Sequence, residues 1–585
     1  MTSPEWKNAL YFGDNLDILR EYIPDETVDL IYLDPPFNSN ATYNVLFREK
    51  TGEESAAQIT AFDDTWHWDM SSEAAYRDVV TNGPSKLADL LQAMRSFLGQ
   101  NDMMAYLTMM AQRMVELHRV LKPTGSLYLH CDPTASHYLK LLLDAVFGSR
   151  NFRNEIVWRR TNAHNNSRIY GRIHDTIFFY SKGSSYFFSP QVRPYLRGYV
   201  ESMFVHEDAN GRYRHADPTA EGVRTGDSGQ PWKGYNPTSA GRHWAMPAYL
   251  REELEDRGEY TEGLSSQEKL DLALKHNLIY LPSGQGGQPQ VKRYLSRRSG
   301  TPLQDIWAYQ PYTEGVLWET DESIDEDVKW TQRPEKLSYP TQKPEGLLRR
   351  IIATSCPPDG VVLDPFCGCG TAVAVAEGLG RKWVGIDVTH IAIALMKSRL
   401  HDTFGEDLSE YEVIGDPKDV ESARALATES QHDGRFQFEW WALGLVDARP
   451  AKKTRGADAG IDGSINFFDD NSGKAKRIIV QVKSGQVERG DVATLKGDME
   501  REKADIGLFV TLVEPTEPMR QEAVSAGFYE PELYPGRLYP RVQILTIEEL
   551  LSGEARAEYP RVAPQATFRR ARRQRRREGS QGELI

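Results

Sequence analysis

Short apolar runs alternate with turn residues and helix-forming segments along much of the chain. The runs at residues 28–33 and 361–363 are each followed at once by a turn, and a third run at 382–387 ends in an acid. Apolar runs of this length beside turn residues are typical of strands that are covered on both faces. A helix is predicted directly after the second turn, at residues 371–376. This alternation predicts an α/β fold.

The first run leads into Asp34-Pro35-Pro36-Phe37, a sequence that suits methylation of an amino group on a nucleic-acid base. The lone pair of such a nitrogen is delocalised into the ring. The nitrogen therefore needs acceptors that hold its hydrogens and turn the lone pair toward a methyl donor. A strand-end carboxylate and a carbonyl fixed by consecutive prolines supply two acceptors, and the phenyl ring can stack on the base. The same residues also occur in ordinary turns, which leaves a structural role open.

Residues 364–371, Asp-Pro-Phe-Cys-Gly-Cys-Gly-Thr, form a candidate cofactor turn. Gly368 and Gly370 let the backbone approach a ligand, and the following helix offers unpaired N–H groups at its start. The glycine spacing fits neither a dinucleotide site nor a phosphate-binding P-loop. The next strand ends at Asp387, close to where a ribose-binding carboxylate belongs in a nucleotide-binding α/β unit. A purely structural glycine turn is the alternative.

Taken together, the two motifs resemble those of the β-type, permuted S-adenosylmethionine-dependent DNA amino-methyltransferases, over about residues 8–420. The resemblance implies a Rossmann-like sheet, S-adenosylmethionine as cofactor and double-stranded DNA as substrate. It assigns catalysis to Asp34, Pro35, Pro36 and Phe37. The residues that it places around the cofactor are Asp14, Thr341, Lys343, Asp364, Pro365, Phe366, Gly368, Gly370, Thr371 and Asp387.

The cofactor turn departs from that family at two positions. Cys367 and Cys369 stand where small residues such as Ala, Gly or Ser are usual. Cysteine is itself small, so we expect the turn to survive. A metal site at this pair is not favoured, because no second Cys/His pair sits nearby at ligand spacing.

The resemblance implies that the target base leaves the duplex and enters a pocket beside Asp34. There Asp34 and the Pro35 carbonyl would accept hydrogen bonds from the amino group while Phe37 stacks on the ring. An aspartate as the first residue of the motif favours adenine N6, since enzymes that act on cytosine N4 more often carry serine there. Cytosine N4 is the alternative target. The expected setting is restriction–modification or phage defence.

The resemblance also divides this part of the chain. The catalytic half is expected at residues 1–184, a target-recognition region at 185–335 and the cofactor half at 336–425. Residues 151–250 carry 13 Lys and Arg against 8 Asp and Glu, together with 17 aromatics, although the net charge of the whole chain is −14. Such a stretch can neutralise phosphates, read base edges and stack on bases. We expect more than half of the aromatics in the recognition region to be core residues instead.

A second α/β unit is expected at residues 431–555. Residues 436–443 read as an amphipathic helix, and Asp462 ends a turn that enters a strand. Gln481 and Lys483 alternate along the next strand, so their side chains share a face.

These elements resemble the Mrr-like branch of the PD-(D/E)xK nucleases. The resemblance implies a small restriction-endonuclease-like domain with Glu439, Asp462, Gln481 and Lys483 as candidate catalytic residues. Asp462 and Gln481 would hold Mg²⁺, which activates water at a phosphodiester. A degenerate nuclease fold that only binds DNA or a partner is the alternative.

Composition adds limits on class and location. Four cysteines, no signal peptide and no long apolar run predict a soluble protein of a reducing compartment. The resemblance implies a prokaryotic cytoplasmic protein that associates with the nucleoid through DNA. Seven arginines at residues 569–577 predict a basic, disordered tail at 556–585. A homodimer or a restriction or defence partner subunit is compatible with this class. A non-catalytic DNA-binding or assembly protein is the remaining alternative, which the intact pair of motifs disfavours.

Overall fold

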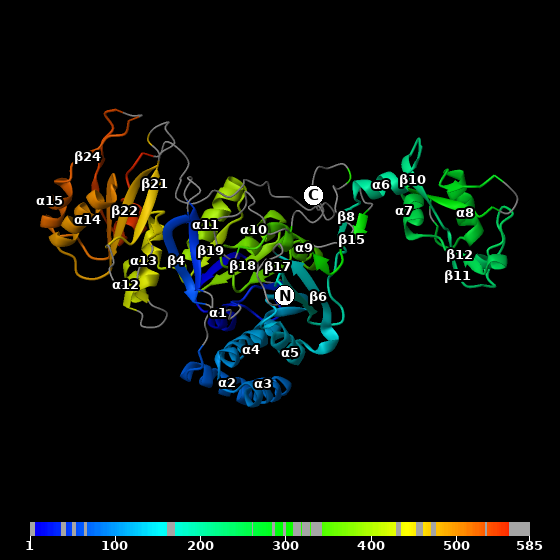
Figure 1. Cartoon of the computed structure of the whole chain (residues 1–585), viewed down its shortest axis with the longest axis horizontal. Coiled ribbons are helices and arrows are strands. Elements are labelled where there is room, and N and C mark those ends of the chain that lie inside the picture. The colour runs from blue at the N-terminus through cyan, green and yellow to red at the C-terminus, as the bar shows by residue number, and fades with distance from the viewer. Residues whose placement is uncertain are drawn as a thin grey trace.

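The computed structural model describes most of the chain (Figure 1). The described residues are 6–36, 42–48, 54–63, 67–160, 170–259, 261–283, 287–295, 300–307, 318, 328, 342–428, 434–451, 460–467, 469, 475–532 and 535–560. Side chains are described for all of them except residues 42–48, 54–63 and 434–435. The predicted site residues Phe37 and Thr341 lie outside the described residues, as do the arginines of 569–577.

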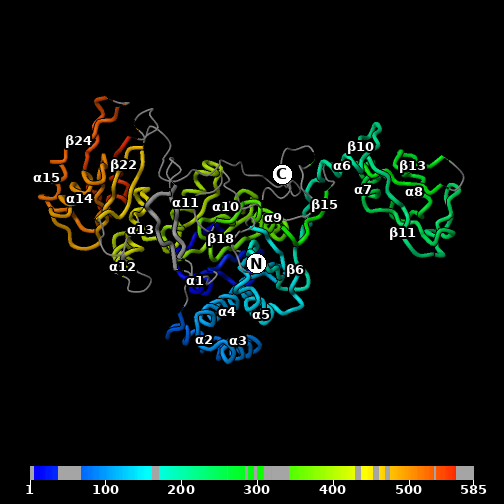
Figure 2. The backbone as a smooth tube through the Cα atoms, viewed as in Figure 1, coloured from blue at the N-terminus to red at the C-terminus, as the bar shows by residue number. Residues whose placement is uncertain are grey.

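A nine-stranded sheet forms the centre of the molecule (Figures 1 and 2). In spatial order its strands are β16 (Ile306–Trp307), β6 (Phe152–Arg159), β7 (His174–Ser181), β5 (Leu121–Cys131), β2 (Val28–Leu33), β17 (Val361–Asp364), β18 (Lys382–Asp387), β1 (Asn8–Phe12) and β19 (Tyr411–Ile414). From β5 to β19 all neighbours are parallel, whereas β7 runs antiparallel to β5 and β6. The predicted α/β fold is thus confirmed.

Side chains along β2 alternate between hydrophobic cores on the two faces of the sheet. Ile31 and Leu33 belong to one core, and Leu30 and Tyr32 belong to the other. The first core includes α1 (Asn15–Tyr22), α4 (Asp102–Val120) and α5 (Ser136–Phe147), with α2 (Met70–Asn82) and α3 (Ser85–Leu98) packed outside them. The second includes α9 (Glu345–Ser355), α10 (Thr371–Gly378) and α11 (His390–Phe404). Every residue of β2 is buried, which explains its continuous apolar run.

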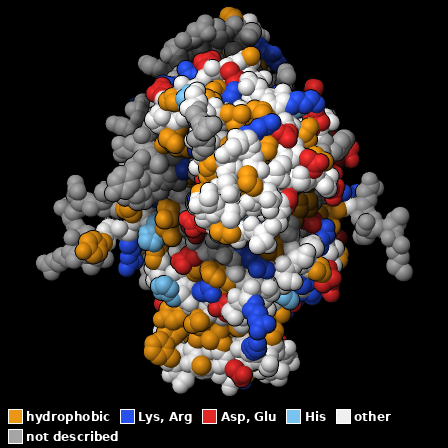
Figure 3. All heavy atoms as spheres, turned by 90° about the vertical axis from the view of Figure 1, so that its right-hand side faces the viewer, with side chains coloured by type: hydrophobic (Ala, Val, Ile, Leu, Met, Phe, Trp, Pro, Cys, Tyr) orange, Lys and Arg blue, Asp and Glu red, His pale blue; other side chains and the backbone are white. Residues whose placement is uncertain are grey.

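A separate lobe projects from the sheet, at the right of Figure 1. It begins and ends on the paired strands β8 (Val192–Pro194) and β15 (Gly300–Pro302). Its own sheet consists of β13 (Ile279–Tyr280), β14 (Gln290–Tyr294), β10 (Gly211–Ala216) and β9 (His206–Asp208). With α7 (Ala248–Asp256) and α8 (Ser266–Lys275), this sheet encloses buried Trp232, Tyr235 and Trp244, which are core residues of the lobe. Seen end on, the lobe side of the molecule carries charges of both signs (Figure 3).

The C-terminal residues form a second α/β domain around a five-stranded sheet. Its strands lie in the order β20 (Arg449–Pro450), β21 (Gly463–Phe467), β22 (Lys476–Lys483), β23 (Ile506–Thr511) and β26 (Val542–Thr546). The helices α13 (Gly434–Leu445) and α16 (Ile547–Ser552) belong to the core on one face. The helices α14 (Arg489–Glu502) and α15 (Glu517–Val524) belong to the core on the other face. The preceding α12 (Val420–Thr428) also packs on this domain.

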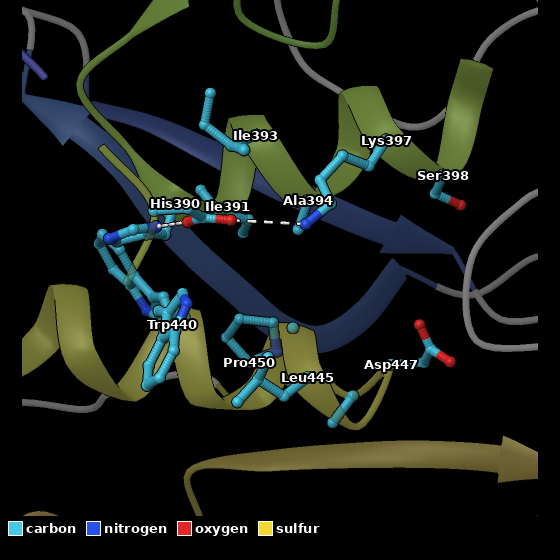
Figure 4. Close-up of a pocket in the computed structure, with 14 residues that line it drawn as sticks. His390, Ile391, Ile393, Ala394, Lys397, Ser398, Trp440, Leu445, Asp447 and Pro450 are labelled. Carbon is cyan, nitrogen blue, oxygen red and sulfur yellow. Dashed lines mark hydrogen bonds and ion pairs between the residues drawn. The ribbon is translucent and has the colours of Figure 1, made fainter. Parts of the chain in front are cut away.

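The two α/β domains meet where α13 packs against α11. A cavity of about 130 Å³ lies between them, lined by His390 on α11 and Trp440 on α13 among others (Figure 4). The imidazole of His390 stacks on Phe12 with ring centroids 3.6 Å apart, and its Nδ1 lies 3.0 Å from Asp416 Oδ1. Within the described ranges, no helix combines the length and apolar character needed to cross a membrane.

Candidate active site

The carboxyl ends of four neighbouring strands bring the candidate residues together. Strand β2 pairs with β17, β17 with β18, and β18 with β1, all in parallel. Because the strands are parallel, the residues that follow them emerge at one edge of the sheet. The acids at or just beyond these strand ends are Asp34, Asp364, Asp387 and Asp14.

Asp34 directly follows β2, which ends before Pro35 because proline has no N–H to donate to a neighbouring strand. Lys343, just before α9, forms an ion pair with Oδ2 of Asp34. The other oxygen, Oδ1, is buried and accepts no hydrogen bond from a described residue. One oxygen of Asp34 is therefore held in place, and the other is available as an acceptor.

A buried polar network of Tyr32, His130 and Asp175 lies next to Asp34. His130 on β5 is 0% exposed, and its Nδ1 lies 3.0 Å from the Tyr32 hydroxyl and 3.9 Å from Asp34 Oδ1. Its Nε2 lies 3.1 Å from Asp175 Oδ2, and Arg160 Nε lies 3.5 Å from Asp175 Oδ1. Burial acts to raise the pKa of Asp175, but the hydrogen bond with His130 and the nearby cations outweigh burial and lower that pKa. Asp175 is therefore a carboxylate at neutral pH.

Two glycines and a side chain of α1 determine the backbone conformation of the turn at 364–371. Gly368 and Gly370 have φ angles of +53° and +73°, a region that favours glycine. A Cβ atom at Gly370 would come within 2.6 Å of Met396 Cγ, so this position has no room for a side chain. From α1, Asn15 Nδ2 donates to the Pro365 carbonyl at 2.7 Å and fixes the start of the turn.

Arg399 on α11 fixes the other end of the turn. Its guanidinium is buried and donates to the Cys369 carbonyl at 3.2 Å and to Thr371 Oγ1 at 3.0 Å. It also donates to Glu345 at 2.8 Å, which balances its charge. Sequence reasoning missed this pair, because an arginine in a helix carries no local signal of burial.

Asp387 and Asp14 hold the adjoining loops. Oδ2 of Asp387 accepts from the Gly368 N–H at 2.9 Å, and Oδ1 accepts from the N–H and hydroxyl of Thr389 at 2.9 and 2.8 Å. A further backbone hydrogen bond from Val388 also reaches this carboxylate, so Asp387 is firmly held beside the turn. Asp14 caps α1 and pairs with Arg113 at 2.8 Å, so it has a clear structural function.

Burial raises the proton affinity of two acids at this edge. Burial raises the pKa of Asp364 to about 8; a hydrogen bond from the Phe366 N–H opposes the rise, and the charges of Asp34 and Asp387 add to it. Burial also raises the pKa of Asp387, against hydrogen bonds from Thr389 and Gly368. A cation bound beside these two acids would favour their ionised forms.

Comparison with known proteins agrees with this arrangement. The N6/N4 methyltransferase family model, described as DNA methylase, matches residues 28–398, which is more than half of the chain. The chain belongs to this DNA methylase family. Asp34 and the turn at 364–371 both lie within the matched residues of the methylase.

Individual relatives are similar over most of the methylase. The type II methyltransferase M.EcaI of Enterobacter cloacae is 26% identical over 394 residues, which cover 67% of this chain and 69% of the relative. The Mod subunit of the type III restriction-modification enzyme StyLTI of Salmonella typhimurium is 26% identical over 385 residues, which cover 64% of this chain and 50% of the relative. The structure of a DNA modification methylase from Thermus thermophilus with S-adenosyl-L-methionine covers 70% of this chain and 98% of its own, with 13% identity and a TM-score of 0.29.

The C-terminal domain matches a different model. Residues 437–552 match the family described as NACHT-associated inactive restriction endonuclease. Gln481 and Lys483 share a face of β22, as predicted, and Asp462 directly precedes β21. However, Asp462 Oδ2 accepts from the Val482 N–H at 2.7 Å, and Lys483 Nζ lies 4.0 Å from Asp491 Oδ1. The Asp462 carboxylate and the Lys483 ammonium therefore both interact with other residues of the C-terminal domain.

The fourth nuclease candidate, Glu439, lies apart from Gln481 and Lys483. Glu439 is buried on α13, which packs on the face of β22 opposite Gln481 and Lys483. No group of three His, Cys, Asp or Glu side chains among the described residues could hold a metal ion. The predicted Mg²⁺ site at Asp462 and Gln481 therefore offers one carboxylate and one amide, and neither belongs to a group of three metal-binding side chains among the described residues.

The raised pKa of Asp364 predicts a specific dependence of stability on pH. The folded protein binds the Asp364 proton more tightly than the unfolded chain does. The contribution of Asp364 to the free energy of unfolding therefore decreases as pH rises from about 4 to about 8. Asp364→Asn keeps the shape of the protonated acid and removes that loss. In urea unfolding at pH 5 to 8, the free energy of unfolding should fall less steeply in the variant, by up to about 1.4 kcal/mol per pH unit.

Asp359→Asn is the matched control, because Asp359 is exposed in the turn before β17. It should follow the wild-type curve. Equal pH slopes for Asp364→Asn and the wild type would contradict the electrostatic picture of this edge.

Proposed function

We propose that the methylase moves a methyl group from S-adenosylmethionine to the exocyclic amino group of a base in double-stranded DNA, with adenine N6 as the target. The free Oδ1 of Asp34, buried at the strand edge beside the turn at 364–371, carries this proposal. A buried acceptor without a partner costs free energy. An amino group placed against Asp34 would satisfy that acceptor.

The residues present fit S-adenosylmethionine, which when bound supplies an electrophilic methyl group on a cationic sulfur. Gly368 and Gly370 adopt left-handed backbone angles in the turn that is proposed to contact the cofactor. Asp387 is proposed to accept from the ribose hydroxyls. Asp364 is proposed to lie beside the positive charge, which would favour its ionised form. The residues proposed around the cofactor are Asp14, Thr341, Lys343, Asp364, Pro365, Phe366, Gly368, Gly370, Thr371 and Asp387.

In the proposed reaction, Asp34 Oδ1 and the Pro35 carbonyl accept the two amino hydrogens, which turns the nitrogen lone pair away from both acceptors. Lys343 holds the other carboxylate oxygen in position. Phe37 is proposed to stack on the extruded base, with Pro36 shaping the turn between them. The N–C bond forms as the S–C bond breaks, and the electron pair of that bond stays on sulfur. The chain supplies position and charge, and no covalent enzyme–base intermediate is needed.

The biological setting is proposed from the relatives and the motif. M.EcaI is a type II methyltransferase and StyLTI Mod is a subunit of a restriction-modification enzyme. We infer a restriction–modification or defence function in the cytoplasm, with the target-recognition region of residues 185–335 contacting the DNA target. A restriction subunit or a second copy of the chain is the proposed protein partner. Cytosine N4 is the second candidate target.

Nucleoside mass spectrometry tests the target directly. Unmethylated DNA incubated with the protein and S-adenosylmethionine should yield N6-methyldeoxyadenosine. Asp34→Ala should lower the rate by about 10²–10³-fold, because the acceptor for the amino group is lost. Asp89→Asn, which changes an exposed acid on α3, should retain the wild-type rate.

Two outcomes would count against these proposals. N4-methyldeoxycytidine alone would overturn adenine as the target. A protein that binds S-adenosylmethionine but methylates no DNA would overturn the proposed function.

For the C-terminal domain, DNA binding is the first candidate function and Mg²⁺-dependent cleavage the second. Asp462, Gln481 and Lys483 support cleavage by their types and their positions on or beside β22. The engaged Asp462 carboxylate and the match to an inactive endonuclease model support binding without cleavage. Both candidates place DNA on this domain.

A plasmid assay separates the two candidates. With Mg²⁺ and no S-adenosylmethionine, unmethylated supercoiled plasmid should be retained by the protein in a gel shift but stay uncut. Cleavage that disappears in Lys483→Ala, but not in the control Lys503→Ala at the end of α14, would instead establish the nuclease and overturn the binding-only proposal.

A further inference from the structure

The methyl transfer proposed above leaves a surplus proton on the methylated nitrogen. The nitrogen gains a fourth bond when the N–C bond forms, so one N–H bond must break while its electron pair stays on nitrogen. Asp34 Oδ1 is the acceptor nearest to that hydrogen in the proposed arrangement, and it is buried. A carboxylic acid formed there must pass its proton on before the next turnover.

His130 lies on the inner side of Asp34, at a place where it can receive that proton. Its Nδ1 is 3.9 Å from Asp34 Oδ1, so an approach of about 1 Å brings the two atoms into hydrogen-bond range. Asp34 Oδ1 has no competing hydrogen bond among the described residues. In the resting protein the hydroxyl of Tyr32 forms a hydrogen bond with Nδ1 of His130, at 3.0 Å.

Asp175 fixes which nitrogen of His130 is free to accept. Nε2 of His130 lies 3.1 Å from Asp175 Oδ2, and a carboxylate can only accept a hydrogen bond. Nε2 therefore carries the hydrogen, and Nδ1 presents its lone pair to Tyr32 and Asp34. The pKa of Tyr32 is raised well above its usual value by burial and by Asp34, so its hydroxyl stays protonated and donates to Nδ1.

We propose that His130 and Asp175 form a proton relay behind Asp34, with His130 as the positioning residue that takes the proton released by the amino group. The proton moves from the amino nitrogen to Asp34 Oδ1 and then to His130 Nδ1, while the Tyr32 hydrogen rotates away. The imidazolium that results is balanced by the Asp175 carboxylate. A buried carboxylate that is hydrogen-bonded to one ring nitrogen of a histidine generally fixes the tautomer and stabilises the imidazolium.

The surroundings of His130 limit how its charge can be balanced. Trp158 on β6 packs edge-on against the imidazole, with ring centroids 5.4 Å apart. The titratable and charged groups that face this site are Tyr32 and Asp34 at β2, Asp175 on β7, Arg160 after β6, Lys343 before α9 and Asp364 on β17. Three of these are acids, and Asp175 is the one in hydrogen-bond contact with the imidazole.

His130→Gln is the decisive variant, because glutamine keeps a donor and an acceptor but cannot take up a proton. The steady-state rate of methyl transfer over several turnovers should fall at least tenfold and lose part of its dependence on pH, since general-base contributions are typically about 10²–10⁴-fold. Affinities for S-adenosylmethionine and DNA should stay within about twofold, because no binding contact is assigned to His130. The matched control is Tyr128→Phe, on the same strand as His130. It removes a buried hydroxyl that is hydrogen-bonded to Ser355 of α9, and it should retain the wild-type rate.

A second readout needs neither cofactor nor DNA. In ¹⁵N spectra of histidine-labelled protein, the His130 ring should show hydrogen on Nε2, and Asp175→Asn should shift the hydrogen toward Nδ1. A wild-type ring with hydrogen on Nδ1 would overturn the relay. Should His130→Gln fail to fold, Asp175→Asn takes its place in the rate measurement, with the same expected loss.

The relay rests on the proposed methylation, and the two can fail separately. An active wild-type protein with an equally active His130→Gln variant would overturn the relay alone. A wild-type protein that methylates no DNA would overturn the proposed function and the relay with it.

Discussion

The site depends on the parallel pairing of β2 with β17. Leu30 lies opposite Val362 and Ile31 opposite Leu363, although more than three hundred residues separate the two strands in the sequence. This pairing places the end of β2, with Asp34, beside the end of β17, with the glycine turn. The lobe and several strands of the sheet are inserted between them in the chain, yet the two ends lie as direct neighbours. Without this register, the candidate catalytic and cofactor residues would belong to separate surfaces.

Bringing these strand ends together concentrates negative charge in a buried place. Asp34, Asp364 and Asp387 lie at one edge, and burial there raises the pKa values of the last two. Lys343 offsets part of the negative charge through its ion pair with Asp34. An acidic edge of this kind suits a cationic methyl donor, and the free Oδ1 of Asp34 suits an amino group. The electrostatic strain of the site and its proposed chemistry are therefore two consequences of one arrangement.

Local sequence was enough to predict the parts of this edge but not the contacts behind it. The apolar runs predicted β2, β17 and β18, because buried parallel strands need apolar residues on both faces. Asp34 stood out because consecutive prolines fix the backbone directly after it, and Gly370 stood out because glycine allows backbone angles that other residues rarely adopt. His130, Asp175 and Arg399 gave no such signal, since their partners come from distant strands and helices. In the C-terminal domain the residue types were visible, whereas the engagement of Asp462 by the Val482 N–H required the structure.

A structure of the protein with S-adenosylmethionine and a DNA duplex tests the central claim most directly. The account predicts that the sulfonium methyl group lies between Asp34 and the turn at 364–371, with an extruded base donating its amino hydrogens to Asp34. The reacting nitrogen and methyl carbon should then be about 3–3.5 Å apart. A cofactor bound away from the edge formed by β2, β17 and β18, or a base held without contact to Asp34, would contradict it.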